Sequence, residues 1–182
     1  MDKKVIKSYM IVSNNALDTL QAKVATFNPN YILFRDKDIL DYSQRAVEFI
    51  NICNRFEFLK TFLHQDAFLA KELGATGVHL TSKQFDEIEY AKSLGLEVII
   101  STHTHKEALE AWRLGADAIT YSPIFYSPNK GEPKGVDDLK ELLTKCNTKV
   151  FALGGIISQE QIDELKKTCV YGFASIRYFE LK

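Results

Sequence analysis

One pattern that occurs three times in the middle of the chain decides the fold: KELGATGVHL at residues 71–80, KSLGLEVIIS at residues 92–101 and WRLGADAITY at residues 112–121. In each copy a helical pattern ends in Leu-Gly, and an apolar run begins within three residues. A glycine just past a helix end takes the left-handed conformation that closes the last turn. The glycines at positions 74, 95 and 115 are 21 and 20 residues apart, which is the length of one strand, one helix and two short loops.

The same rhythm extends outward to eight expected strands, and amphipathic helical stretches lie between them. The strands are expected at residues 9–12, 31–34, 61–64, 77–80, 98–101, 118–121, 149–153 and 172–176. Most are continuous apolar runs, which is typical of parallel strands covered on both faces. The sequence therefore predicts an α/β fold in which residues 1–182 form a single (β/α)8 TIM barrel. An open doubly wound sheet is the alternative.

The end of the chain departs from a complete barrel. Six residues follow position 176, too few for a full eighth helix, so we expect a truncated or missing final helix. The seam between the first and last strands would then be an exposed apolar strip, or a second copy would cover it in a homodimer.

Composition narrows the class of protein. The chain has 182 residues, 46% of them hydrophobic, and a net charge of -1, so it lacks the basic excess of a nucleic-acid-binding protein. No apolar run approaches the ~20 residues of a membrane span. Cys53, Cys146 and Cys169 are scattered without a CxxC pair, so we expect buried, reduced thiols and a cytoplasmic location.

In such barrels the active site forms where strands end and loops begin. Gly154 and Gly155 follow an expected strand, and Ser158 with Gln161 forms a capping box for the next helix. Backbone N–H groups at such a loop and helix start bind anions, so we expect a phosphate site there. Lys130, near the tip of the long loop after residues 118–121, could close over the anion, although a solvated surface lysine is the alternative.

Other polar side chains also follow strands. Arg35 and Lys37 flank an acid, which suits a phosphate or pyrophosphate, or else forms a surface ion-pair cluster. His103 is placed for proton transfer near neutral pH, with a structural histidine as the alternative. His105 begins the next helix and is expected to be exposed, whereas His79 lies in an apolar run and is expected to be a hydrogen-bonded core histidine.

Six short segments, in order, give the chain a resemblance to a known family. They are FRDK at 34–37, GVHL at 77–80, STH at 101–103, GAD at 115–117, SPIF at 122–125 with Lys130, and LGGI at 153–156. With them, nearly the whole chain resembles thiamin phosphate synthase and its relative TenI. The resemblance implies a barrel that binds thiazole phosphate or thiamin phosphate. In the synthase, pyrophosphate leaves an aminopyrimidine, the thiazole nitrogen attacks, and Mg²⁺ neutralises the pyrophosphate.

The resemblance also implies roles for individual residues. Arg35 and Lys37 match the pyrophosphate-facing cations, and Gly154 and Gly155 match the cradle of the thiazole phosphate. The other ligand-binding candidates, which lie after the third, fifth, sixth and eighth strands, are His64, Ser101, Ser127, Asn129, Lys130 and Arg177. Arg177, where the family often has a small serine, could grip the phosphate or fill its site.

The metal-binding acids of the synthase are absent from the matching positions. The family's Asn-Asp pair falls on His64 and Gln65, and its second acid falls on Gln84. A glutamine carries no charge to hold a hard divalent cation. Asp66 and Asp86 lie nearby but are displaced in register.

TenI-type tautomerases move protons on a thiazole phosphate carboxylate and need no pyrophosphate metal, and a histidine in TenI matches His103. The resemblance therefore favours a TenI-like thiazole tautomerase with His103 as acid and base and without a cofactor. Two alternatives stay open: a Mg²⁺-dependent thiamin phosphate synthase and a non-catalytic sensor of a phosphorylated ligand.

Overall fold

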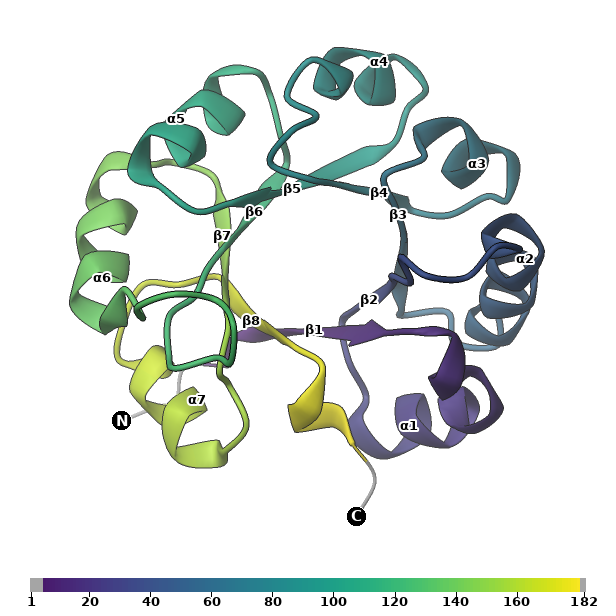
Figure 1. The fold of residues 1–182 in the computed structure, drawn as a ribbon, viewed down its shortest axis with the longest axis horizontal. Helices are drawn as coiled ribbons and strands as arrows, with labels where there is room; N and C mark the ends of the chain where they lie inside the picture. Colours follow the sequence, from purple (N-terminus) through teal and green to yellow (C-terminus); the bar gives the residue numbers. More distant parts are fainter. Residues whose placement is uncertain (1–4, 181–182) are drawn as a thin grey trace.

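The computed structural model describes residues 5–180, so residues 1–4 and 181–182 of the expected domain lie outside the described part. Eight parallel strands form a closed barrel in sequence order, and β8 pairs with β1 (Figure 1). The strands are β1 Lys7–Val12, β2 Tyr31–Phe34, β3 Lys60–His64, β4 Gly77–Leu80, β5 Glu97–Thr102, β6 Ala118–Tyr121, β7 Lys149–Leu153 and β8 Gly172–Ser175. The TIM-barrel prediction is confirmed, and the open sheet is wrong.

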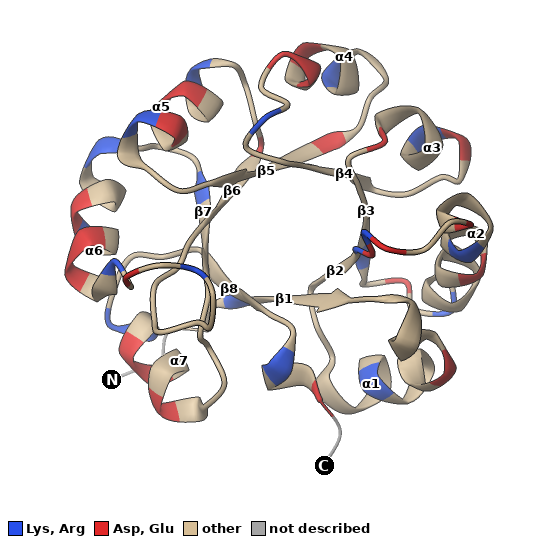
Figure 2. Ribbon diagram, viewed as in Figure 1, with Lys and Arg blue, Asp and Glu red and all other residues tan. Residues whose placement is uncertain are grey.

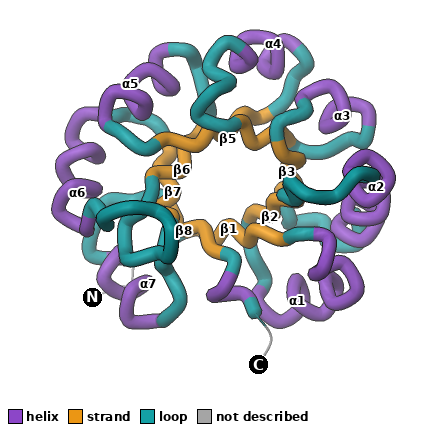
Figure 3. Tube along the Cα trace, in the orientation of Figure 1, coloured by secondary structure: helices purple, strands orange, loops and turns teal. Residues whose placement is uncertain are grey.

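Helices surround the barrel on its outer side (Figure 3). They are α1 Leu20–Phe27, α2 Tyr42–Cys53, α3 Ala67–Glu72, α4 Glu87–Ser93, α5 His105–Arg113, α6 Gly135–Lys145 and α7 Gln159–Lys166, with the short 3-10 helices η1 Asn14–Thr19 and η2 Arg177–Phe179. Gly74, Gly95 and Gly115 have φ values of 68°, 79° and 89°. The repeated glycines therefore close α3, α4 and α5 as expected.

The interior of the barrel is packed rather than hollow. Side chains alternate along each strand between the helices and the barrel axis. The axial set comprises Tyr9, Ile11, Tyr31, Leu33, Phe62, Ile99, Ala118, Phe151 and Ala174, all at most 6% exposed. A Cβ at Gly77 or Gly172 would lie 2.6 or 2.7 Å from the Phe62 or Phe151 ring, so these glycines make room for aromatic packing. A ligand must therefore lie above this layer, at an end of the barrel.

The seam between β8 and β1 is closed by the chain itself. The eighth helix is replaced by η2, as expected for a truncated end (Figure 1). Phe179 on η2 is 2% exposed; its ring stacks on Phe173 at 5.8 Å and meets Phe27 edge-on at 5.5 Å. Phe179 on η2 therefore fills part of the gap left by the missing helix, while Ile176 beside it stays 52% exposed, so the apolar strip expected there is covered only in part. The homodimer stays a prediction.

The thiols differ from the expectation in one place. Cys53 and Cys146 are buried, but Cys169 is exposed, because it follows the end of α7 at Lys166 and faces outward. Between residues 5 and 180, no helix has the length and apolar character needed to span a bilayer.

Candidate functional site

The loops that follow the eight strands meet at one end of the barrel, and this mouth holds the candidate residues. On its β2–β3 side, charged residues of both signs follow β2 (Figure 2). Burial lowers the pKa of the half-buried Arg35 guanidinium, although Asp36 opposes the shift. Burial, followed by the charges of Arg35 and Lys37, lowers the pKa of His64 to about 4. His64 is therefore neutral at pH 7, and the positive charge on this side belongs to Arg35 and Lys37.

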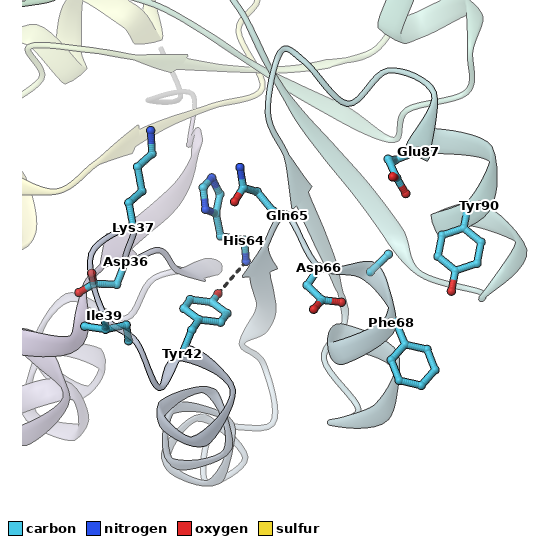
Figure 4. A pocket seen from close by; sticks show the side chains of 11 residues that line it. Asp36, Lys37, Ile39, Tyr42, His64, Gln65, Asp66, Phe68, Glu87 and Tyr90 are labelled. Carbon is cyan, nitrogen blue, oxygen red and sulfur yellow. Dashed lines mark hydrogen bonds between the residues drawn. The ribbon is translucent and has the colours of Figure 1, made fainter.

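A pocket of about 710 Å³ opens beside His64, between the β2–α2 loop and helices α3 and α4 (Figure 4). It is lined by Asp36, Lys37, Ile39, Tyr42, His64, Gln65, Asp66, Ala67, Phe68, Glu87 and Tyr90. The Tyr42 hydroxyl accepts a hydrogen bond from the His64 N–H at 2.9 Å and donates one to the Phe34 carbonyl at 2.8 Å. Tyr42 thus ties α2 to β2 and β3 at the mouth, a role that its sequence position on an amphipathic helix did not reveal.

The residues at the family's metal positions do not fit a divalent cation. The Gln84 amide nitrogen donates to the Gln65 carbonyl at 3.2 Å, and the Gln84 side-chain oxygen accepts from the Thr81 N–H and hydroxyl, both at 3.1 Å. The Asp66 carboxylate is occupied in capping α3, where it accepts from the Leu69 N–H at 2.8 Å. Over residues 5–180, no three His, Cys, Asp or Glu side chains form a group that could hold a metal ion. The two positions where a metal site would need carboxylates are therefore occupied by neutral glutamines, and the Gln84 side chain bonds the backbone of Gln65.

The end of β5 contributes Ser101 and His103. Ser101 Oγ lies 3.0 Å from Nε2 of the buried His79, whose Nδ1 lies 2.9 Å from the Tyr9 hydroxyl, which confirms His79 as a hydrogen-bonded core histidine. His103 is exposed, and its Nδ1 lies 3.2 Å from both the carbonyl and the hydroxyl oxygen of Ser122. The His103 imidazole is thus held at the rim of the mouth.

His105 is half-buried rather than exposed, which corrects the expectation. Its Nε2 lies 3.3 Å from an Asp138 carboxylate oxygen, and its ring packs near Tyr121. The reason is that α5 turns this side chain toward β6 and α6, away from solvent. His105 therefore belongs to the packing between helices and not to the mouth.

The β6–α6 loop lies over the β7–β8 part of the barrel (Figure 1). Its tip carries Ser127, Asn129 and Lys130, and the Lys130 N–H donates to the Ser127 carbonyl at 3.2 Å. The Lys130 side chain is exposed, as either sequence interpretation allows.

Gly154 and Gly155 let the β7–α7 loop pack tightly against the β6–α6 loop. Their φ values are 99° and 69°, and a Cβ would lie 2.7 Å from Pro123 Cα or 2.3 Å from the Tyr126 carbonyl oxygen. The Gly154 carbonyl accepts from the Phe125 N–H at 3.0 Å. The two glycines are therefore needed for contact between loops, whether or not a ligand approaches them.

The predicted capping box is present at α7. Ser158 Oγ accepts from the Gln161 N–H at 3.5 Å, and the Gln161 side-chain oxygen accepts from the N–H groups of Ile157 and Ser158 at 2.8 and 3.1 Å. The Gln161 amide nitrogen donates to the Gly155 carbonyl at 2.8 Å. Because Gln161 engages the last N–H groups of the loop, an anion would have to use those nearer Gly154 and Gly155. Arg177, exposed at the start of η2, follows the neighbouring strand β8.

The barrel thus places the candidates around one mouth. Cationic side chains lie on the β2–β3 side, a hydroxyl and an imidazole at β5, and the glycine loop and Arg177 at β7–β8. Such an arrangement can hold anionic groups at opposite sides of a ligand and place a proton-transfer group between them.

Comparison with known proteins agrees with this architecture. The sequence model of the family TMP-TENI, described as thiamine monophosphate synthase, matches residues 5–179. The putative thiamine-phosphate synthase 2 of Aquifex aeolicus is 32% identical over 91% of this chain and 90% of its own length. The thiamine-phosphate synthase of Nitrosococcus oceani is 29% identical over 74% of this chain and 65% of its own length.

Solved structures share the fold. The thiamine phosphate pyrophosphorylase from Pyrococcus furiosus superimposes with a TM-score of 0.78 at 23% identity, covering 94% of this chain and 85% of its own. An N-acetylmannosamine-6-phosphate 2-epimerase from Clostridium perfringens gives 0.73 at 12% identity, covering 95% and 87%. At these identities the likeness concerns the fold alone. The match of the family model over residues 5–179, together with the similarity to the Aquifex protein along nearly its full length, shows that this chain belongs to the thiamine monophosphate synthase (TMP-TENI) family.

Proposed function

We propose that the protein catalyses the condensation for which its relatives are named, thiamine-phosphate synthesis, at the mouth of the barrel. The observation that carries the proposal is the match of the synthase family over residues 5–179, with relatives named as synthases. These names favour the synthase alternative over the TenI-like tautomerase that the sequence suggested, and the tautomerase is not confirmed.

The two substrates of the condensation would bind on different sides of the mouth. Arg35 and Lys37 would hold the pyrophosphate of the aminopyrimidine, and the loop of Gly154 and Gly155 would hold the thiazole phosphate, with Lys130 above it. The bond from carbon to pyrophosphate breaks with its electron pair going to pyrophosphate, and the thiazole nitrogen lone pair forms the new C–N bond. Since neutral amides stand at the metal positions, we assign the charge on the leaving group to the cationic side chains.

The test is an assay of thiamin phosphate by thiochrome fluorescence, with aminopyrimidine pyrophosphate and thiazole phosphate as substrates. We expect turnover in the wild type and a loss of about a hundredfold in Arg35→Ala, because one charge-stabilising donor contributes about this much. Arg113→Ala makes the same change at an exposed arginine at the end of α5, on the side of the barrel opposite the mouth, and this matched control should keep full activity. Absence of turnover, with a known synthase active in parallel, refutes the condensation.

A thiazole tautomerase is the second candidate, favoured by the exposed His103 imidazole beside Ser122 and by the neutral residues at the metal positions. His103→Ala should then abolish isomerisation of the thiazole phosphate carboxylate, while its affinity stays within a few-fold. Turnover that survives this change rules out the acid-base role. A ligand sensor, the remaining alternative, would bind thiazole phosphate without either reaction.

A further inference from the structure

A chain of hydrogen bonds runs from the dry interior of the barrel to the mouth. The Tyr9 hydroxyl lies 2.9 Å from His79 Nδ1, and His79 Nε2 lies 3.0 Å from Ser101 Oγ. Tyr9 and His79 are 0% and 3% exposed, whereas Ser101 is half-buried. Ser101 therefore stands at the boundary between the core and the mouth.

The surroundings of Tyr9 decide which way the protons point. Its ring packs against the aromatic rings of Tyr31, Phe62 and Phe151 at centroid distances of 5.8, 5.8 and 5.2 Å. Among the described residues, His79 Nδ1 is the hydrogen-bond partner of the Tyr9 hydroxyl. If Nδ1 carried the proton, the Tyr9 O–H would be a buried donor without an acceptor, which is costly in an apolar interior. Tyr9 must therefore donate to a bare Nδ1, and the imidazole proton lies on Nε2.

The direction of the last hydrogen bond follows from that tautomer. His79 Nε2–H donates to Ser101 Oγ, so the hydroxyl proton of Ser101 is free to point toward the mouth. We propose that Tyr9 and His79 are positioning residues that fix Ser101 as a hydrogen-bond donor to an acceptor oxygen of the bound phosphorylated ligand. The proposal rests on the proposed function for its ligand and adds the direction of the hydrogen bond, which selects a phosphate oxygen over an N–H group.

A second hydroxyl lies beside Ser101 on the neighbouring strand. Thr120 on β6 is paired in register with Ser101, and because it lies two residues after Ala118 of the axial set it points to the same face of the strand. Its Oγ1 is buried, and within residues 5–180 it has no hydrogen-bond partner. A buried polar atom of this kind is normally paired. The β5–β6 edge therefore carries two hydroxyls on the axial face, Ser101 half-buried at the boundary and Thr120 fully buried.

The tautomer is tested directly on the whole protein, labelled with ¹⁵N in its histidine rings, by long-range ¹H–¹⁵N correlation at neutral pH. His79→Gln identifies the His79 signals by their loss. We expect a protonated Nε2 and a bare Nδ1. A protonated Nδ1 overturns the proposal, whatever the protein binds.

The role of the relay is tested by calorimetry with inorganic pyrophosphate. Ser101→Ala should weaken binding about tenfold or more, as for loss of a hydrogen bond to a charged group. Tyr9→Phe should weaken binding about threefold, because the Ser101 hydroxyl is then less well oriented. The same change should have no further effect on binding in the Ser101→Ala background. Tyr31→Phe is the matched control, because its hydroxyl bonds Tyr171 at the other end of the barrel. If Tyr9→Phe weakens binding equally in the wild type and in the Ser101→Ala variant, the relay is overturned. If the wild type does not bind pyrophosphate, the proposed function is contradicted, and the tautomer of His79 then decides the relay.

Discussion

Replacing Phe179 by alanine tests whether η2 closes the barrel in place of the eighth helix. Phe179 is 2% exposed and contacts the rings of Phe173, Phe27 and Tyr178 at 5.8, 5.5 and 5.2 Å. Truncation of a buried phenylalanine costs about 3–5 kcal/mol, from lost apolar burial and the cavity that remains. For a domain of this size each kcal/mol lowers the melting temperature by about 2–4 °C, so we expect a fall of roughly 6–20 °C.

The assay is urea unfolding followed by far-UV circular dichroism, with Phe58→Ala as a matched control. Phe58 undergoes the same change of side chain but is 58% exposed, so we expect a loss of about 0.5 kcal/mol or less. If Phe179→Ala lies within about 1 kcal/mol of the wild type, or equals Phe58→Ala, the seam is not held by η2. The reasoning about the missing helix would then fail.

Three further outcomes follow from the structure. Burial, Arg35 and Lys37 lower the pKa of His64 to about 4, so as the pH falls from 6.5 to 4 the unfolded chain binds more protons and His64 lowers the free energy of unfolding by about 3 kcal/mol. Burial lowers the pKa of His79 to about 3, so His79 adds a similar loss over the same window. His64→Gln should therefore make the pH profile clearly shallower without abolishing it, and an unchanged slope contradicts the prediction. Gly155→Ala places a Cβ 2.3 Å from the Tyr126 carbonyl oxygen at a φ of 69°, so the affinity for thiazole phosphate, measured by calorimetry, should drop at least tenfold. Gly131→Ala is the control, because Gly131 also has a positive φ but has open space around its Cβ position. Pyrophosphate affinity should stay within twofold when Mg²⁺ is replaced by EDTA, because Gln65 and Gln84 are neutral; a strong Mg²⁺ requirement would show that other residues bind the metal.

Local sequence was sufficient for the elements and their order. The repeated Leu-Gly followed by an apolar run marks a helix end and a strand start within ten residues, and both are short-range signals. The expected strands match the observed ones to within two residues at their ends. The capping box of Ser158 and Gln161 is equally local and was equally readable.

The candidate site was predictable only as a list of positions. That residues after parallel strands share one mouth follows from the fold class, so Arg35, His103 and Gly154 could be placed there in advance. Tyr42 was missed because its contacts with His64 and Phe34 depend on how α2 lies across two strands. His105 was misjudged because one residue of rotation at a helix start decides between core and solvent, and Cys169 was misjudged because α7 ends at Lys166, before the residue that the helical pattern was extended to include.

What the sequence alone determined is the alternation of strands and helices, since periodicity and glycine stops act over a few residues. What only the tertiary structure decided is which distant side chains meet. Tyr9, His79 and Ser101 come from three different strands, and their contacts depend on the register of a closed barrel. The pairing of Gln65 with Gln84 and the insertion of Phe179 at the seam have the same origin. Register, strand tilt and closure are global properties of the packed chain, and no local pattern encodes them.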